Sequence, residues 1–470
     1  MNAHDPKERA SSKAVPVKTA AAPHAHTDPL HLTPVAAKAV VLDFDGGRLS
    51  SDAGLLLLKD VDEQLGLTGA LAAVLSDPRK AHQINFTSHD LLRQRVFQIA
   101  AGYEDANDSN TLRDDPIFKM MLDRLPETGA PLASQPTLSR FENRVSRTEI
   151  YRMAEVFLDH FIASYDTEPE VIVLDVDDTE DAVHGQQEQA RYDGYYGGYC
   201  FLPLHLYEGL SGRLITTILK ARRFTGPQML ALLKRLVQRL RHAWPKTLLI
   251  FRGDSHFAYP EVMKWIEAQE QISYVTGLTS NAVLQKLAQE VVAQAKKAYA
   301  LEGHKVTRFH STSYQAGTWS RQRRVVIKVE MSEQGLNTRF VVTDMEQART
   351  KVLYQQIYCA RGQAENYIKD HKRYVKSDRT SCHRFTANQF RLLLHSAAYV
   401  LLDTLRREVL GTTLWASATI ETIQLRLLKL GARVTELKTR IRLSLPASCP
   451  VAPVLQRSFS LLSAVRLSLL

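Results

Sequence analysis

The chain is poor in cysteine and has no long hydrophobic run. Its four cysteines lie far apart among 470 residues, without the Cys-x-x-Cys spacing of a zinc knuckle. We therefore expect neither a disulfide framework nor a cysteine-bound metal, and a reducing, cytoplasmic location. No stretch approaches the roughly 18 consecutive apolar residues that a membrane span needs, so we predict no membrane partner.

Acidic residues are outnumbered by basic ones. The chain has 60 Lys and Arg against 50 Asp and Glu, and its formal net charge is +10. A hydrophobic fraction of 44% and a charged fraction of 23% exclude collagenous, disordered and coiled-coil chains. The positive surplus favours a polyanionic partner. Because no basic amphipathic anchor stands out, nucleic acid is favoured over a membrane surface.

Changes of composition divide the chain into five parts. The start mixes Pro, Ala, His and Lys without periodicity, which is typical of a disordered tail and not of a secretory signal. Apolar residues at three/four spacing then predict helices over 55–65, 89–101, 116–125 and 147–162. We predict a tail over 1–38, a mainly helical N-terminal domain over 39–166, a core over 167–278 and 346–410, a mostly β insertion over 279–345, and a basic C-terminal region over 411–470.

The helical domain contains a candidate DNA-binding face. Residues 135–144 predict a short helix with Ser139, Arg140, Asn143 and Arg144 on one side. A helical domain with such a face is typical of DNA-binding proteins. A solvated helix in a packing domain is the alternative.

From residue 170 onward the pattern alternates between strands and helices. Three short apolar segments joined by turns predict hairpin-connected strands, and a helix, a strand, a second helix and a last strand follow. The predicted strands are 171–176, 201–207, 213–220, 247–251 and 272–278. This is the element order of a ribonuclease-H-like core. We therefore predict a mixed α/β fold with helices on both faces of a mixed sheet.

Acidic residues fall where this core would bring them together. Asp175 and Asp177 end the first strand and, being two apart, point to the same side. Asp254 follows the fourth strand, which lies beside the first in this order, and Glu365 lies on a long helix that would cross the sheet. Such a cluster repels itself without a cation, and its oxygen donors suit two Mg²⁺ ions, with Mn²⁺ as a substitute. The sequence predicts a two-metal site for phosphodiester chemistry.

One face of the long helix carries further polar residues. Tyr358, Arg361, Glu365 and Lys372 are spaced three, four and seven apart, so at about 3.6 residues per turn they share one face. Besides the metal ligand, this face would offer Tyr358, Arg361 and Lys372 to a DNA backbone. An ordinary Arg361–Glu365 ion pair on a solvated helix is the alternative.

Together these motifs resemble those of DDE transposases. The pattern Tyr-x-x-Arg-x-x-x-Glu-x-x-x-x-x-x-Lys, from Tyr358 to Lys372, matches the third-acid signature of transposases related to the IS-four group. Further segments are similar to the IS-thirteen-eighty insertion-sequence family, namely 43–47, 51–54, 102–108, 112–116, 174–181 and 184–187. The resemblance extends from about residue 40 to residue 440.

The resemblance implies a DNA transposase that cleaves and joins transposon ends by phosphoryl transfer. It selects Asp177, in an Asp-x-Thr position, as the first acid, Asp254 as the second and Glu365 as the third, with Asp175 as an alternative first acid. The implied partners are double-stranded DNA, both terminal inverted repeats and target, and further copies in a homodimer or larger assembly. The implied location is the nucleoid in a prokaryotic cytoplasm. An insertion between the second and third acids is also a feature of such transposases.

Two other enzyme classes fit parts of the pattern. The segment from Asp175 to Thr179 resembles the nucleophile loop of haloacid-dehalogenase-like phosphatases, with Asp175 as nucleophile and Asp177 as acid/base. The predicted hairpins argue against it, because that loop needs parallel β-α-β units. A non-transposing ribonuclease-H-like nuclease would use the same three carboxylates.

A tyrosine-rich run, Tyr-Asp-Gly-Tyr-Tyr-Gly-Gly-Tyr, spans residues 192–199. Its rings would suit stacking on splayed bases. The favoured interpretation is a β-hairpin lined with aromatic packing.

Overall fold

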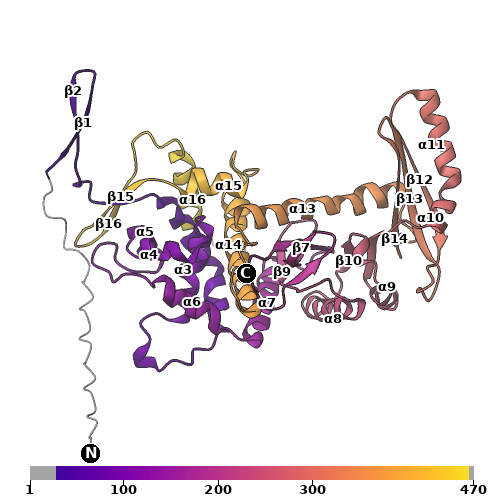
Figure 1. Ribbon diagram of the computed structural model, residues 1–470, viewed down its shortest axis with the longest axis horizontal. Helices are drawn as coiled ribbons and strands as arrows, with labels where there is room; N and C mark the ends of the chain where they lie inside the picture. Colours follow the sequence, from indigo (N-terminus) through magenta and orange to yellow (C-terminus); the bar gives the residue numbers. More distant parts are fainter. Residues whose placement is uncertain (1–27, 465–470) are drawn as a thin grey trace, which may run out of the picture.

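An eight-stranded mixed sheet organises the part of the molecule that carries the acidic residues (Figure 1). The computed structural model of the chain describes residues 28–464. The strand order is β12-β13-β14-β11-β10-β4-β8-β9. The strands are β4 (Val171–Asp178), β8 (Leu204–Glu208), β9 (Leu214–Ile218), β10 (Leu248–Gly253), β11 (Ile272–Leu278), β12 (Val306–Tyr314), β13 (Arg323–Ser332) and β14 (Gly335–Thr343).

Five of these strands have the order and directions that the sequence predicts. β4 lies parallel to β10, and β10 lies parallel to β11. β8 pairs antiparallel with β4, and β9 pairs antiparallel with β8. Two helices, α8 (Gly226–Ala243) and α9 (Pro260–Ile266), make the connections between the parallel strands. The carboxyl ends of β4 and β10, with Asp177 and Asp254, therefore lie side by side.

The two faces of the sheet are covered differently. Ile172, Leu174 and Val176 of β4 pack in one cluster with side chains of α8 and α9. Val173 packs in another cluster with Leu353 and Tyr354. Because side chains alternate along a strand, Asp175 and Asp177 share the face of Val173, beneath the helix that carries Glu365.

That helix runs without a break from the end of the sheet to the helical part of the molecule (Figure 1). Its successive parts are α12 (Thr350–Val352), η5 (Leu353–Tyr358), η6 (Cys359–Arg361), α13 (Gly362–Lys369) and η7 (Asp370–Tyr374). The segments η5 and η7 are π-helical and η6 is 3₁₀-helical, so the pitch departs from the α-helix assumed in the spacing argument.

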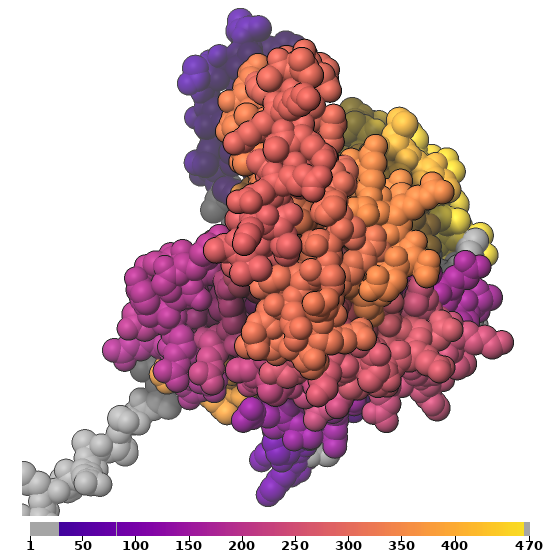
Figure 2. Space-filling view, turned by 90° about the vertical axis from the view of Figure 1, so that its right-hand side faces the viewer, coloured from indigo at the N-terminus to yellow at the C-terminus, as the bar shows by residue number. Residues whose placement is uncertain are grey.

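The predicted insertion extends the main sheet. Its last strand, β14, pairs antiparallel with β11, and β12 and β13 continue outward from it. The insertion also contains two helices, α10 (Ala282–Leu287) and α11 (Gln289–Glu302), and α11 packs against β12 and β13. In Figure 2 the insertion covers the middle of the end face of the molecule.

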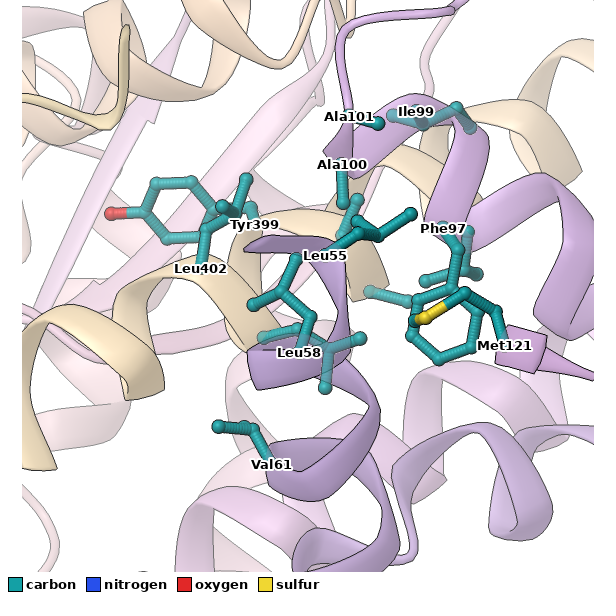
Figure 3. Packing of buried hydrophobic residues seen from close by; sticks show 14 of the residues in the cluster. Leu55, Leu58, Val61, Phe97, Ile99, Ala100, Ala101, Met121, Tyr399 and Leu402 are labelled. Atoms are coloured by element: carbon teal, nitrogen blue, oxygen red, sulfur yellow. The ribbon is translucent and has the colours of Figure 1, made fainter. Parts of the chain in front are cut away.

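A second core joins helices from both ends of the chain. Leu55, Leu58 and Phe97 pack with Tyr399 and Leu402 in one buried cluster (Figure 3). The helices concerned are α1 (Leu56–Leu65), α2 (Leu67–Ala73), α3 (Ser88–Ala100), α4 (Ser109–Leu112), α5 (Pro116–Met121), α6 (Gln135–Arg144), α7 (Arg147–Ala163), α14 (Phe385–Thr404), α15 (Ile420–Ile423) and α16 (Ala452–Ala464). The four helices predicted over residues 55–162 are confirmed as α1, α3, α5 and α7, whereas the packing of α14 among them was not predicted.

Small sheets complete the fold. A hairpin of β1 (Leu30–Val35) and β2 (Lys38–Leu42) begins inside the predicted tail, whose residues 1–27 lie outside the described part. β3 (Arg48–Ser50) joins β15 (Ala432–Glu436) and β16 (Ile441–Ser444), which ties the C-terminal region to the N-terminal helices. No helix within residues 28–464 has the length and apolar character to cross a bilayer.

Three buried histidines join the sheet to the second core. His205 lies on β8, His371 on η7 and His395 on α14. The Nδ1 atoms of His205 and His371 lie 3.4 Å apart, and His395 Nδ1 lies 2.6 Å from the Val375 carbonyl oxygen. Burial lowers the pKa of all three imidazoles, that of His371 to about 3.

Buried carboxyls with a raised pKa, such as Asp181 at about 7, favour the folded chain as the pH falls. We expect the three buried histidines to act in the opposite direction and to lower the free energy of unfolding below about 6.5, the ordinary pKa of histidine. The unfolded chain binds protons there that the folded chain does not, so each histidine adds up to about 1.4 kcal/mol per pH unit to the slope. Urea unfolding at pH 7.5, 6.5 and 5.5 measures how the free energy of unfolding depends on pH. His395→Gln should reduce the slope, and an unchanged slope in this variant would contradict the assignment.

Candidate active site

A cleft of about 480 Å³ lies between the carboxyl end of β4 and the helix α13–η7. Two of the predicted acids, Asp177 and Glu365, line this cleft, as does the predicted cation Lys372. The lining residues are Asp177, Asp178, Thr179, Glu365, Ile368, Lys369, Lys372, Arg373 and Asp378.

Arg361 bridges two of the acids. Its Nη1 lies 3.0 Å from Asp177 Oδ2 and its Nη2 lies 3.0 Å from Glu365 Oε1. The Glu365 side chain is 61% exposed, whereas the Asp177 side chain is 16% exposed. The ordinary Arg361–Glu365 pair therefore exists, but the same guanidinium also holds the first predicted acid.

Asp177 occupies an environment that disfavours its charge. Burial raises the pKa of this carboxyl to about 7, with Arg361 opposing the rise and the negative charge of Asp254 adding to it. The Asp177 Oδ1 atom accepts a hydrogen bond from the Asp178 amide at 3.0 Å. Asp177 is thus a partly buried carboxylate that an additional cation would stabilise.

Asp254 caps the short helix η4 (Ser255–Phe257) at the end of β10. Its Oδ1 accepts from the His256 amide at 2.8 Å, and its Oδ2 lies 3.0 Å from His256 Nδ1. Its charge acts on Asp177, Tyr358 and Arg361. His256 therefore orients the second predicted acid.

Arg361 lies between two of the three acids, Asp177 and Glu365, whereas Asp254 is paired with His256. Among residues 28–464, no three His, Cys, Asp or Glu side chains are close enough together to hold one metal ion. The guanidinium of Arg361 neutralises Asp177 and Glu365 from between them, so these two carboxylates share a cationic partner. Asp177 and Glu365 therefore lie close together with a guanidinium as their common partner, and the assignment of the three acids as metal ligands stays a prediction.

Asp175, the alternative first acid, lies in a buried ion pair. Its two carboxylate oxygens accept from Nε and Nη2 of Arg252 at 2.5 and 2.6 Å, and its side chain is 0% exposed. The pairing of β4 with β10 sets these two residues opposite each other. Gly209 leaves the necessary room, because a Cβ there would lie 2.5 Å from Arg252 Nη2.

Arg252 also positions the helix above the cleft. Its Nη1 donates to the carbonyl oxygen of Ile357, one residue before Tyr358. Tyr358 in turn lies over β11, where a Cβ on Gly277 would be 2.7 Å from the tyrosine oxygen. One arginine therefore connects β4, β10 and the helix that carries Arg361 and Glu365.

A family model described as "Transposase DDE domain group 1" matches residues 32–467. The chain belongs to this DDE transposase family. This finding confirms the resemblance at the level of DDE transposases, and membership in the IS-thirteen-eighty family stays a prediction. No curated protein sequence matches the chain significantly.

One solved structure similar to this transposase is the cryo-EM structure of a piggyBac transposase synaptic complex with hairpin DNA. The two chains are 12% identical, with a TM-score of 0.42. The match covers 81% of this chain and 80% of that one.

Some polar residues at the transposase cleft were missed in the sequence. Lys369 and Arg373 follow Glu365 by four and eight positions, so helical spacing could have identified them. Lys220 forms a buried ion pair with Asp178, and nothing in the sequence indicated that contact. Lys372, which was predicted, donates to the carbonyl oxygen of Glu180.

The predicted face of helix α6 is partly occupied by internal contacts. Arg144 Nη1 lies 3.2 Å from Asp77 Oδ1, and its Nη2 donates to Ser88 at 2.7 Å. Asn143 donates to the carbonyl oxygen of Ser139. Arg140 remains exposed, so less of that face is available than the sequence suggested.

The structure lacks the parallel β-α-β framework that the phosphatase alternative requires after β4. The next strand of the main sheet after β4 is β8, which pairs with it antiparallel and is followed by β9 antiparallel to β8, so no parallel β-α-β unit follows β4 directly. Asp175, which that chemistry needs as a nucleophile, has both oxygens bound to Arg252.

Proposed function

We propose that this transposase cleaves and joins the ends of a mobile DNA element with Asp177, Asp254 and Glu365 as its DDE carboxylates, on a ribonuclease-H-like core. The observation that carries the proposal is the bridging of Asp177 and Glu365 by Arg361, which brings residues from distant parts of the sequence to one cleft. The parallel pairing of β4 and β10 supports the place of Asp254 beside them. The buried Asp175–Arg252 pair supports Asp177 over Asp175 as the first acid.

The donor set fits two Mg²⁺ ions, with Mn²⁺ as a substitute. All three predicted ligands are carboxylates, the oxygen donors that hard divalent cations take. The raised pKa of Asp177 also fits a site built for added positive charge. Asp177 and Asp254 would hold both ions, and Glu365 would complete one site. When bound, the ions supply activation of the attacking hydroxyl and stabilisation of the leaving 3′ oxygen.

The cations along the helix are suited to hold the DNA backbone. Lys369, Lys372 and Arg373 line the cleft beside Glu365, where phosphate oxygens would enter. Tyr358 offers a further hydroxyl donor. The partners we propose are double-stranded DNA of the terminal inverted repeats, target DNA, and further copies of the chain in a dimer or larger assembly that acts at the nucleoid of a prokaryotic cell.

The test is cleavage of a labelled duplex that contains one end of the element and its flank. We expect strand cleavage that leaves a 3′-OH in Mg²⁺ or Mn²⁺ and none in EDTA, because the carboxylates need their cations. Joining of the cleaved end to a target plasmid separates a transposase from a simple nuclease. Cleavage that persists in EDTA, or hydrolysis of small phosphate esters without DNA cleavage, would contradict the proposal.

A further inference from the structure

A small tyrosine-rich sheet stands beside the cleft. It consists of β5 (Asp181–Ala182), β6 (Arg191–Asp193) and β7 (Gly198–Phe201) in the order β5-β7-β6, inserted between β4 and β8. Tyr192, Tyr195 and Tyr199 are 62%, 80% and 61% exposed. The hairpin expected over this run is present, but its rings lie largely in solvent.

The rings contact each other instead of a core. Tyr192 and Tyr199 pack edge to face with centroids 5.8 Å apart, and Tyr195 packs likewise on Tyr196 at 4.9 Å. Apart from the adjacent residues, no heavy atom lies within 4 Å of a Cβ built on Gly194, Gly197 or Gly198. The tip of the hairpin therefore has open space around it. The tyrosine rings contact one another but still leave most of their surface exposed to solvent.

The base of this sheet is fixed to the cleft. Phe201 packs against Phe385 of α14 with ring centroids 5.4 Å apart. Glu180, directly before β5, accepts a hydrogen bond from Lys372, and Asp181 accepts one from Thr380. The small sheet that bears the exposed rings is thus linked to the cleft, because Lys372 both lines the cleft and donates to Glu180.

Positive charge accompanies the rings. Arg191 is exposed at the start of β6, next to Tyr192. The charge of Arg223 acts both on Tyr196 of the hairpin and on Asp178 of the cleft, which places the two features in one electrostatic neighbourhood. Aromatic faces interleaved with cations are suited to a nucleic-acid strand with accessible bases.

We propose that the hairpin residues Tyr192, Tyr195 and Tyr199 form a stacking platform for unpaired bases of the strand next to the cleaved phosphodiester. The inference rests on the proposed function and deepens it by naming the ligand, a single-stranded or locally opened nucleotide. Bases within a duplex are already stacked, so exposed rings add affinity only when the strand has been opened. Every base has a π-face, so the platform would act without reading sequence.

The test is binding of a fluorescent oligothymidine strand and of a matched duplex, both in EDTA. Tyr195→Ala/Tyr199→Ala should weaken single-strand binding by roughly tenfold or more and duplex binding much less, because stacking is lost. Tyr195→Phe/Tyr199→Phe should retain the affinity, since the ring and not the hydroxyl stacks. Tyr151→Ala is the matched control, because Tyr151 is also exposed but lies on α7 against Arg235.

The outcomes separate this inference from the proposed function. Equal single-strand affinity of the double alanine variant and the wild type would overturn the platform, even if the wild type cleaves DNA in Mg²⁺. A variant that changes oligomeric state at unchanged single-strand affinity would also overturn it, in favour of a protein contact. Absence of metal-dependent cleavage by the wild type would instead contradict the proposed function. That result would not affect the platform, because the binding assay contains no metal.

Discussion

Asp177→Asn is expected to lose transposon-end cleavage in Mg²⁺ by about a thousandfold while the protein stays folded. Metal-assisted stabilisation of the transition state is worth several kcal/mol, and each 1.4 kcal/mol is about tenfold in rate. The amide keeps the shape of the side chain, which is only partly buried and lies at the rim of the cleft. Single-turnover cleavage rates and thermal unfolding of the same preparation measure both effects.

Asp175→Asn is the matched contrast, two residues away on the same face of β4. It leaves the buried guanidinium of Arg252 without its charged partner, and breaking a buried pair costs about 3–5 kcal/mol. We expect a large fall in the urea midpoint, and Arg252→Ala should reproduce it because it breaks the same pair. If Asp175→Asn is stable but inactive and Asp177→Asn is active, the first acid lies at position 175.

Some features of β4 could be predicted from the sequence and others could not. Hairpin turns and two-residue alternation are local, so the strand order and the shared face of Asp175 and Asp177 were predictable. Which of the two carboxylates lies in a fully buried ion pair depends on the residue opposite on β10, and Arg252 comes from a strand far along the chain. Nothing within β4 itself distinguishes a structural from a catalytic aspartate.

The helix above the cleft gives a second example. The spacing of Arg361 and Glu365 predicted their ion pair, which is present. The contact of Arg361 with Asp177 depends on how the helix crosses the sheet, and the π-helical turns that set its path have no signal in the spacing. Long-range packing also explains why the partners of α14 in the second core were missed.

Removal of the Arg361 bridge is expected to have a large effect on metal affinity. Arg361→Ala should bind Mn²⁺ roughly tenfold or more tightly than the wild type, because the guanidinium competes with cations for Asp177 and Glu365. The hydrogen bond to the mostly buried Asp177 is worth about 1.5–3 kcal/mol and the pair with the exposed Glu365 about 0–1 kcal/mol, so removing both frees the two carboxylates for a metal. Titration calorimetry with Mn²⁺ in the absence of DNA measures this affinity independently of cleavage.

Two further variants make the result specific. Lys372→Ala removes a cation from the same cleft that donates to a backbone carbonyl, so Mn²⁺ affinity should stay near the wild-type value while DNA binding weakens. Arg361→Lys should lie between wild type and alanine, because one ammonium group cannot reproduce the two-armed bridge. Unchanged or weaker Mn²⁺ binding by Arg361→Ala would mean that Arg361 supports the acids instead of competing for them. Tighter Mn²⁺ binding together with weaker DNA binding would assign Arg361 two successive partners, the carboxylates before cation entry and the DNA backbone afterwards.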